Sequence, residues 1–260
     1  HPEEIAKEYG IPSESASLIL PSVTIYKRII EELEAEVIYL PGTSLSDGIA
    51  YDYAQKMRYI RPEHQFSADI IAAARIIAKR YQGNKGHIRN LENLALPIFD
   101  KMKKISGLGE RERLLLQIAV MLHGGGKYIN LSDAAQCSYS IIMATEIIGL
   151  STAERRIIAN VVKYNTVEFT LEDVLEQQLR QEDYLVIVKL VAILRVANAL
   201  DRSHKQKFEQ VRLTLKDAQL EIVVDTSEDI TLEKGLFPPK ADYFEEVFHV
   251  RPLIRKKRNL

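Results

Sequence analysis

The spacing of apolar residues divides the chain into helical and strand-like regions. Between residues 62 and 204, apolar residues recur at steps of three and four, which is the period of amphipathic helices. Phe66, Ile70, Ala74 and Ile77 form the first such face. Residues 114–122 and 184–200 are apolar on nearly every side, a pattern typical of helices buried all round. We therefore predict a helical bundle built around two central helices.

The two ends of the chain follow other patterns. Residues 211–224 alternate apolar and polar side chains around a turn at 216–219, which predicts a β-hairpin. We expect a helix after residues 238–239 and a last edge strand over 250–257, since that segment contains Pro252. Near the other end, residues 36–40 predict a short strand and 44–47 a capping box before a helix. A single strand among helices cannot pair its own edges, so this segment is interpreted as the end of an α/β lobe.

These patterns predict a mainly α protein in three parts. Residues 1–60 are the end of an α/β lobe, 61–206 an all-α domain, and 207–260 a small α+β lobe. Capping-box patterns at 151–154 and 170–173 predict two further helix starts in the middle part.

Composition limits the function classes. Apolar residues make up 46% of the 260 residues, and no window of about 18 apolar residues indicates a membrane span. A single cysteine, Cys137, excludes internal disulfides and a multi-cysteine zinc site. The chain shows no secretory leader pattern, which favours a cytoplasmic protein. Lys and Arg number 35 against 36 Asp and Glu, so net charge says nothing about partners, although basic residues gather at 202–207 and 251–258.

Both central helices end in polar residues, and this is where helical bundles build metal or phosphate sites. His123 follows the first helix, and Asn198, Asp201, Arg202 and His204 lie on or after the second. The segments 123–130 and 195–204 together resemble the HD-type helical domain of the exopolyphosphatase/guanosine pentaphosphate phosphohydrolase (Ppx/GppA) family. Residues 40–53 resemble the segment that closes the family's actin-like (ribonuclease H-like) half, and residues 240–252 its C-terminal α+β lobe. Matching segments occur in the family's order over nearly the whole chain.

The resemblance implies an HD metal centre, but most of its ligands are missing. The family pattern has an early His, a His-Asp pair, a late Asp and additional histidines. The corresponding residues here are His87, His123 with Gly124, Asn198, Cys137 and Asn165. Since anionic ligands supply much of the affinity of a hard-metal site, we expect a degenerate HD site with no metal or cofactor in this chain. Asn198 is expected to hydrogen-bond His87 or His123 in the core.

The resemblance also implies where the chemistry lies. In that family, removal of a terminal phosphate belongs to the actin-like half, whose phosphate loops are absent from this sequence, and Mg²⁺ is expected for the full-length enzyme. We therefore expect a C-terminal accessory half, inactive alone, that binds polyphosphate or a guanosine polyphosphate, works with an N-terminal half and supports a homodimer. Because phosphate oxygens favour Arg and Lys donors, the expected polyanion-binding residues are Lys127, Lys163, Arg195, Arg202, His204 and Lys205.

Two other functions stay open. One is a metal-dependent HD phosphohydrolase that acts on a nucleotide through His87 and His123. The other is a non-catalytic interaction scaffold. The glycines at 124–126 followed by Lys127 lack the spacing of a Walker phosphate loop, although exposed amides beside this lysine could hold an anion.

Overall fold

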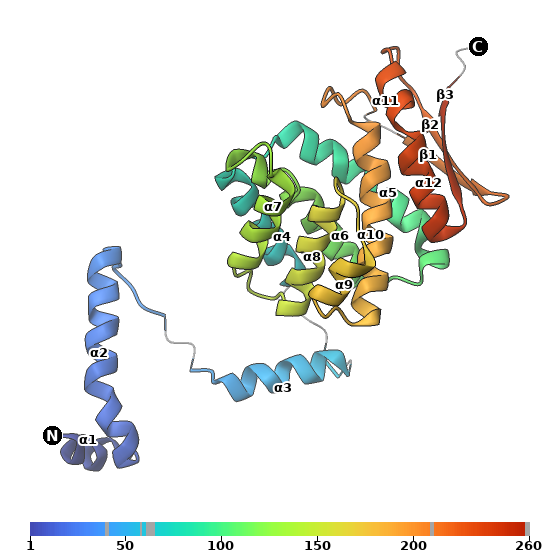
Figure 1. Cartoon of the computed structure of the whole chain (residues 1–260). Helices are drawn as coiled ribbons and strands as arrows, with labels where there is room; N and C mark the ends of the chain where they lie inside the picture. The colour runs from blue at the N-terminus through green and yellow to red at the C-terminus, as the bar shows by residue number, and fades with distance from the viewer. Residues whose placement is uncertain (40–41, 58, 61–65, 209–210, 258–260) are drawn as a thin grey trace. The chain divides into compact units, whose positions relative to one another are not determined.

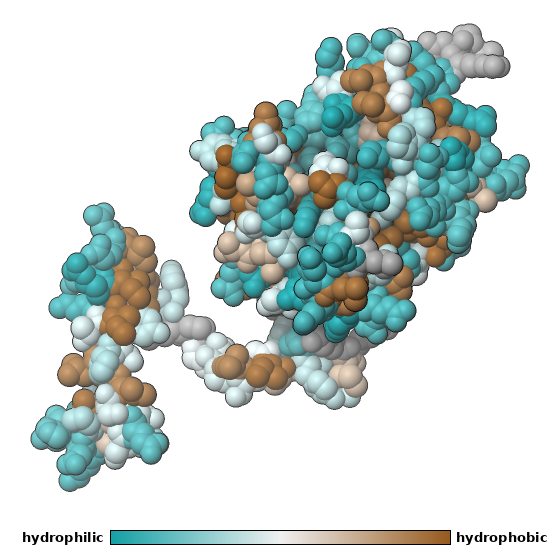
Figure 2. All heavy atoms as spheres, in the orientation of Figure 1, coloured by the Kyte–Doolittle hydropathy of each residue, from teal (hydrophilic) through white to brown (hydrophobic). Residues whose placement is uncertain are grey.

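The computed structural model describes residues 1–39, 42–57, 59–60, 66–208 and 211–257, and the chain separates into two compact units, residues 1–63 and 64–260 (Figure 1). The first unit contains helices α1 (Pro2–Tyr9), α2 (Ser13–Leu33) and α3 (Leu45–Lys56). The predicted capping box begins α3, because Ser44 Oγ accepts a hydrogen bond from the backbone N–H of Asp47 at 3.3 Å. Figure 2 shows apolar side chains along one side of α2. Leu18, Ile25 and Ile29 of this helix are exposed within this unit.

The predicted strand at residues 36–40 is wrong for its described part. Residues 36–39 form no strand, and Leu40 lies outside the described residues. An isolated extended segment gains no ladder hydrogen bonds, and the described residues of the first unit offer no second strand to pair with. The assignment of residues 1–60 to an actin-like lobe therefore stays a prediction.

The second unit is built around the two central helices that the apolar pattern predicts. Its helical part contains α4 (Phe66–Arg80), α5 (Lys85–Ser106), α6 (Glu110–Leu122), the 3-10 helix η1 (Gly125–Tyr128), α7 (Ala134–Ala144), α8 (Thr152–Tyr164), α9 (Leu171–Glu176) and α10 (Gln181–Leu200). Helix α6 packs against α4, α5 and α8, and α10 packs against α5, α6 and α8. Nearly every residue of α6 from Leu114 onward is buried, as are most residues of α10 from Ile187 onward. Capping boxes at Ser151 and Thr170 begin α8 and α9, as predicted.

A small sheet lies beside the end of the bundle (Figure 1). Strands β1 (Val211–Lys216) and β2 (Gln219–Val224) form the predicted antiparallel hairpin, with Asp217 and Ala218 both at positive φ in its turn. Helices α11 (Thr231–Leu236) and α12 (Pro238–Phe248) lead to β3 (Arg251–Lys256), which pairs parallel to β2 as an edge strand. Helix α12 packs against both α10 and β3, so it places its first turn next to the polar end of α10. In the part of the chain that the structure describes, no helix has the length and apolar character needed to cross a membrane.

Candidate functional site

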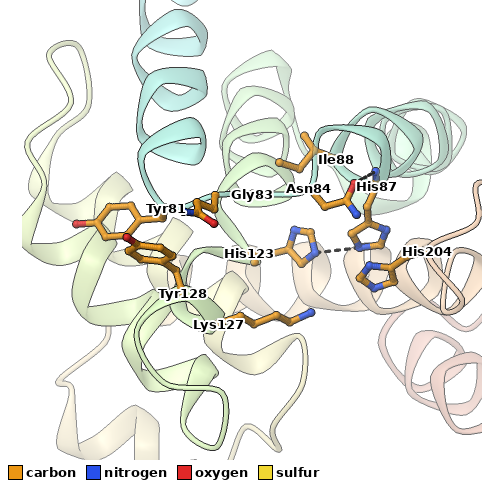
Figure 3. A pocket seen from close by; sticks show the side chains of 11 residues that line it. Tyr81, Gly83, Asn84, His87, Ile88, His123, Lys127, Tyr128 and His204 are labelled. Atoms are coloured by element: carbon orange, nitrogen blue, oxygen red, sulfur yellow. Dashed lines mark hydrogen bonds between the residues drawn. The ribbon is translucent and has the colours of Figure 1, made fainter.

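A cavity of about 460 Å³ opens where α5 begins and α6 ends (Figure 3). The polar side chains that line it come from five segments of the bundle, namely the end of α4, the end of α6, the start of α5, η1, and the turn after α10. They are Tyr81, Gln82, Asn84, His87, His123, Lys127, Tyr128 and His204. His87 and His123, the two histidines that match the predicted HD pattern, therefore meet in one cavity, together with two of the six predicted polyanion-binding residues.

A chain of hydrogen bonds runs through the wall of this cavity. Asp201 Oδ2 lies 2.6 Å from His87 Nδ1, and His87 Nε2 lies 3.2 Å from His123 Nε2. His123 Nδ1 lies 2.7 Å from the carbonyl oxygen of Val120. His204 stacks on the ring of His87, with ring centroids 3.8 Å apart and planes 7° from parallel. Asp201 is 1% and His87 2% exposed, so the pair that anchors this chain is inside the protein.

The partners of these rings fix where the protons lie. A backbone carbonyl can only accept, so His123 Nδ1 carries a proton and its Nε2 presents a lone pair. The Asp201 carboxylate likewise accepts from His87 Nδ1. The contact between the two Nε2 atoms is then a hydrogen bond only when His87 carries a second proton and donates it to His123. Burial, followed by repulsion from His87, lowers the pKa of His123 to about 3, which agrees with a neutral His123.

The ends of α5 and α10 hold this chain in place. Asn84 caps α5, since its Oδ1 accepts from the backbone N–H of His87 at 3.0 Å. Asp201 follows the last residue of α10 and also accepts from the backbone N–H of Gln206 at 2.9 Å. Burial alone would raise the pKa of Asp201, but the hydrogen bonds from His87 and Gln206 help to hold it below its usual value. The carboxylate is therefore ionised, and both of its oxygens accept hydrogen bonds within the protein.

The glycines after α6 serve close packing. A Cβ on Gly126 would lie 2.0 Å from the carbonyl oxygen of Ala134, so only glycine fits against α7. The Gly126 amide donates to Ser138 Oγ at 2.9 Å, and the Lys127 amide donates to the Gly124 carbonyl at 3.3 Å. Both amides are already used within the protein. An anion at this loop would therefore rely on the Lys127 side chain.

The residues in the cavity do not fit the HD metal centre that the family resemblance implies. Among the described residues there is no group of three or more His, Cys, Asp or Glu side chains that could hold a metal ion. Asp201 bonds the far nitrogen of His87, and His204 stacks on that ring. The expectation that Asn198 bonds His87 or His123 is wrong, because Asp201, one helical turn further along, contacts His87 and Asn198 lines a different cleft.

The six predicted polyanion-binding residues do not form one group. Lys127 and His204 share the cavity, while Arg195 and Arg202 line a second cleft of about 350 Å³ together with Asn165 and Asn198. Lys163 lies 4.0 Å from Asp173. Lys205 lines a third, open hollow beside Lys207 and Asp225.

Two residues near these sites were missed by the sequence reasoning. Asp201 follows an apolar helix, three residues after Asn198, which was the expected HD position. Its place in the sequence did not indicate that its side chain bonds His87. Lys240 lines the second cleft from the start of α12 and has no motif around it that indicates a site.

Comparison with known families decides the relationship of the chain. A family model described as Ppx/GppA phosphatase, domain III, matches residues 71–237. The chain belongs to the Ppx/GppA phosphatase family. The matched region begins within α4, covers the rest of the bundle to α10 and continues through α11.

Individual relatives agree with this assignment. The chain is 27% identical over 189 residues to a guanosine-5'-triphosphate,3'-diphosphate pyrophosphatase of Aeromonas hydrophila subsp. hydrophila, a match that covers 72% of this chain and 36% of that protein. It is 22% identical over 154 residues to a protein of the same name from Photobacterium profundum, covering 59% of this chain and 30% of the relative. The chain thus spans about a third of the length of the curated relatives it matches.

Proposed function

We propose that this chain is the accessory part of a Ppx/GppA phosphohydrolase, which binds and positions a guanosine polyphosphate or polyphosphate while hydrolysis takes place in residues outside this sequence. The observation that carries the proposal is a set of cations without counter-ions at the polar end of the bundle. Lys127, Arg195, Arg202 and Lys205 form no ion pair with any described residue. Uncompensated Lys and Arg side chains along clefts attract and orient polyanions.

The name of the relatives favours one ligand over the other. Proteins from three genera that match this chain are named guanosine-5'-triphosphate,3'-diphosphate pyrophosphatases. We therefore propose a guanosine polyphosphate as the preferred ligand, with inorganic polyphosphate as the second choice. Mg²⁺ and homodimer formation belong to the same proposal for the full-length protein.

Calorimetry with the chain tests this function. We expect binding of guanosine 5'-triphosphate 3'-diphosphate that weakens with added salt, because screening reduces attraction between exposed charges. Substitution Lys127→Gln combined with Lys205→Gln should weaken binding by about tenfold or more, since a hydrogen bond to a charged group contributes about 1.5–3 kcal/mol. Lys101→Gln, an exposed lysine on α5 away from the clefts, is the matched control for lost charge. Binding that is equal in the double variant and the control would contradict the proposal.

Metal analysis separates this function from the HD phosphohydrolase. The accessory function expects no stoichiometric transition metal in protein purified without chelator. A stoichiometric metal that is lost in His123→Ala would favour the enzyme instead, and the cavity of His87 and His123 would then be its site.

A further inference from the structure

The cleft at the start of α12 gathers three cationic side chains from two elements. Arg195 and Arg202 come from α10 and the turn after it, and Lys240 comes from the first turn of α12. None of the three forms an ion pair with any described residue. Burial, followed by repulsion from Arg195 and Arg202, lowers the pKa of Lys240, so the three charges act on one another. Glu168 attracts Arg195 from beyond ion-pair distance. Three like charges in one cleft, none of them in an ion pair with a described residue, favour a bound anion.

Arg195 is held so that part of its guanidinium stays available. Its Nε and Nη2 donate to the carbonyl oxygen of Tyr164 at 3.0 and 2.7 Å, and Nη2 also donates to the carbonyl oxygen of Val167 at 2.6 Å. The guanidinium carbon lies 4.3 Å from the ring centroid of Tyr243. These contacts fix the plane of the group but leave Nη1, with its two N–H bonds, without a hydrogen-bond acceptor among the described residues. A guanidinium fixed in this way binds an oxyanion with little loss of side-chain entropy.

Asn165 adds an unpaired polar atom to the same cleft. Its side chain lines the cleft and is only 3% exposed, and its Oδ1 accepts no hydrogen bond from any described residue. Buried carbonyl oxygens in folded proteins nearly always have a donor. A nucleoside offers N–H and O–H donors, whereas an ionised phosphate chain offers only acceptors. The apolar part of the wall, formed by Ala199, Leu236 and Pro239, suits the body of a nucleoside.

We propose that this cleft binds a guanosine nucleotide through one phosphoryl group, held by Arg195, Arg202 and Lys240, with Asn165 accepting a hydrogen bond from the nucleoside. The inference deepens the proposed function and rests on it. It assigns to Lys240 and Asn165 roles that differ from those of Lys127 and Lys205, which lie outside this cleft.

Titration calorimetry with guanosine 5'-diphosphate and with inorganic pyrophosphate tests the site. The variant Arg202→Gln with Lys240→Gln should bind both probes at least about tenfold more weakly, because two charge-assisted contacts are lost. The control, Lys234→Gln with Lys101→Gln, removes the same charge from exposed positions outside the cleft and should match the wild type. Asn165→Ala should weaken guanosine diphosphate binding severalfold and leave pyrophosphate binding unchanged. Thermal melting of each variant checks that the fold is kept.

The outcomes distinguish a failure of this inference from a failure of the proposed accessory function. If the cleft variant binds like its control while Lys127→Gln with Lys205→Gln still weakens binding, the cleft is not a site and the accessory function stands. If Asn165→Ala affects both probes equally or neither, the cleft does not recognise a nucleoside and that part is overturned. If the wild-type chain binds neither probe, the inference fails, and the proposed function fails with it only if guanosine 5'-triphosphate 3'-diphosphate does not bind either.

Discussion

Replacement of Asp201 by alanine should cost more stability than any surface change in the second unit. The carboxylate is buried and accepts hydrogen bonds from His87 Nδ1 at 2.6 Å and from the Gln206 amide at 2.9 Å. Removing it leaves the N–H at His87 Nδ1 and a backbone N–H without their acceptor inside the protein. A buried donor left without its acceptor costs about 1–3 kcal/mol. With two such donors, we take about 3 kcal/mol for Asp201→Ala.

Urea unfolding followed by circular dichroism measures this cost. With a slope of about 2.5 kcal/mol per M, a loss of about 3 kcal/mol moves the midpoint down by about 1.2 M. Asp201→Asn keeps the volume and one acceptor oxygen, so it should lose only about 1 kcal/mol. A midpoint for Asp201→Ala that lies within about 0.2 M of the wild type, at an unchanged slope, would refute the claim that this carboxylate anchors the hydrogen-bond chain.

Three further predictions follow from other contacts. Gly126→Ala should unfold or severely destabilise the second unit in a melting experiment, while Gly124→Ala, whose added Cβ meets no atom within 4 Å, should stay close to wild type. Lys207→Ala should lower the free energy of unfolding by about 3 kcal/mol, because it leaves Glu233, 0% exposed and 3.0 Å from the Lys207 Nζ, as a buried unpaired charge; Lys207→Arg should recover part of the loss. The pKa of His123 in the folded state is about 3, below its ordinary value of 6.5. Between these two pH values the unfolded chain binds more protons than the folded chain. The free energy of unfolding should therefore fall as the pH is lowered from 6.5 to about 3. His123→Gln should flatten the fall, and an unchanged pH profile would count against a neutral, part-buried His123.

The helical core could be predicted from sequence because burial on every side leaves a simple signal. Residues 114–122 and 184–200 are apolar at almost every position, and they form α6 and α10. The hairpin and the helix caps were equally local, since each depends on residues within a few positions of one another. The strand at 36–40 failed in its described part because a strand depends on a partner far away in the chain. The parallel pairing of β3 with β2 also joins distant segments, and no local pattern indicates it.

The candidate site was harder to predict for the same reason. The sequence placed His87 and His123 at matching positions of a known pattern, and the structure brings their rings together. It gave no means to decide which polar side chain at the end of α10 turns toward them. Asp201, three residues after Asn198, bonds His87 inside the protein, while Asn198 lines the second cleft. Lys240 approaches Arg195 and Arg202 only through the packing of α12 against α10. Such a contact depends on tertiary structure, and the spacing of residue types along the sequence does not predict it.

The hydrogen-bond chain behind the cavity has a consequence for how anions are attracted there. The Asp201 carboxylate lies 2.6 Å from His87 Nδ1 and offsets any positive charge on that ring, and His123 is neutral. The floor of the cavity therefore carries no net positive charge despite its imidazoles. The lowered pKa of His204, caused first by burial, removes a further positive charge at neutral pH. If the cavity binds a phosphate as proposed, the attraction comes from the side chain of Lys127, and counting histidines in this sequence overstates how positive the cavity is.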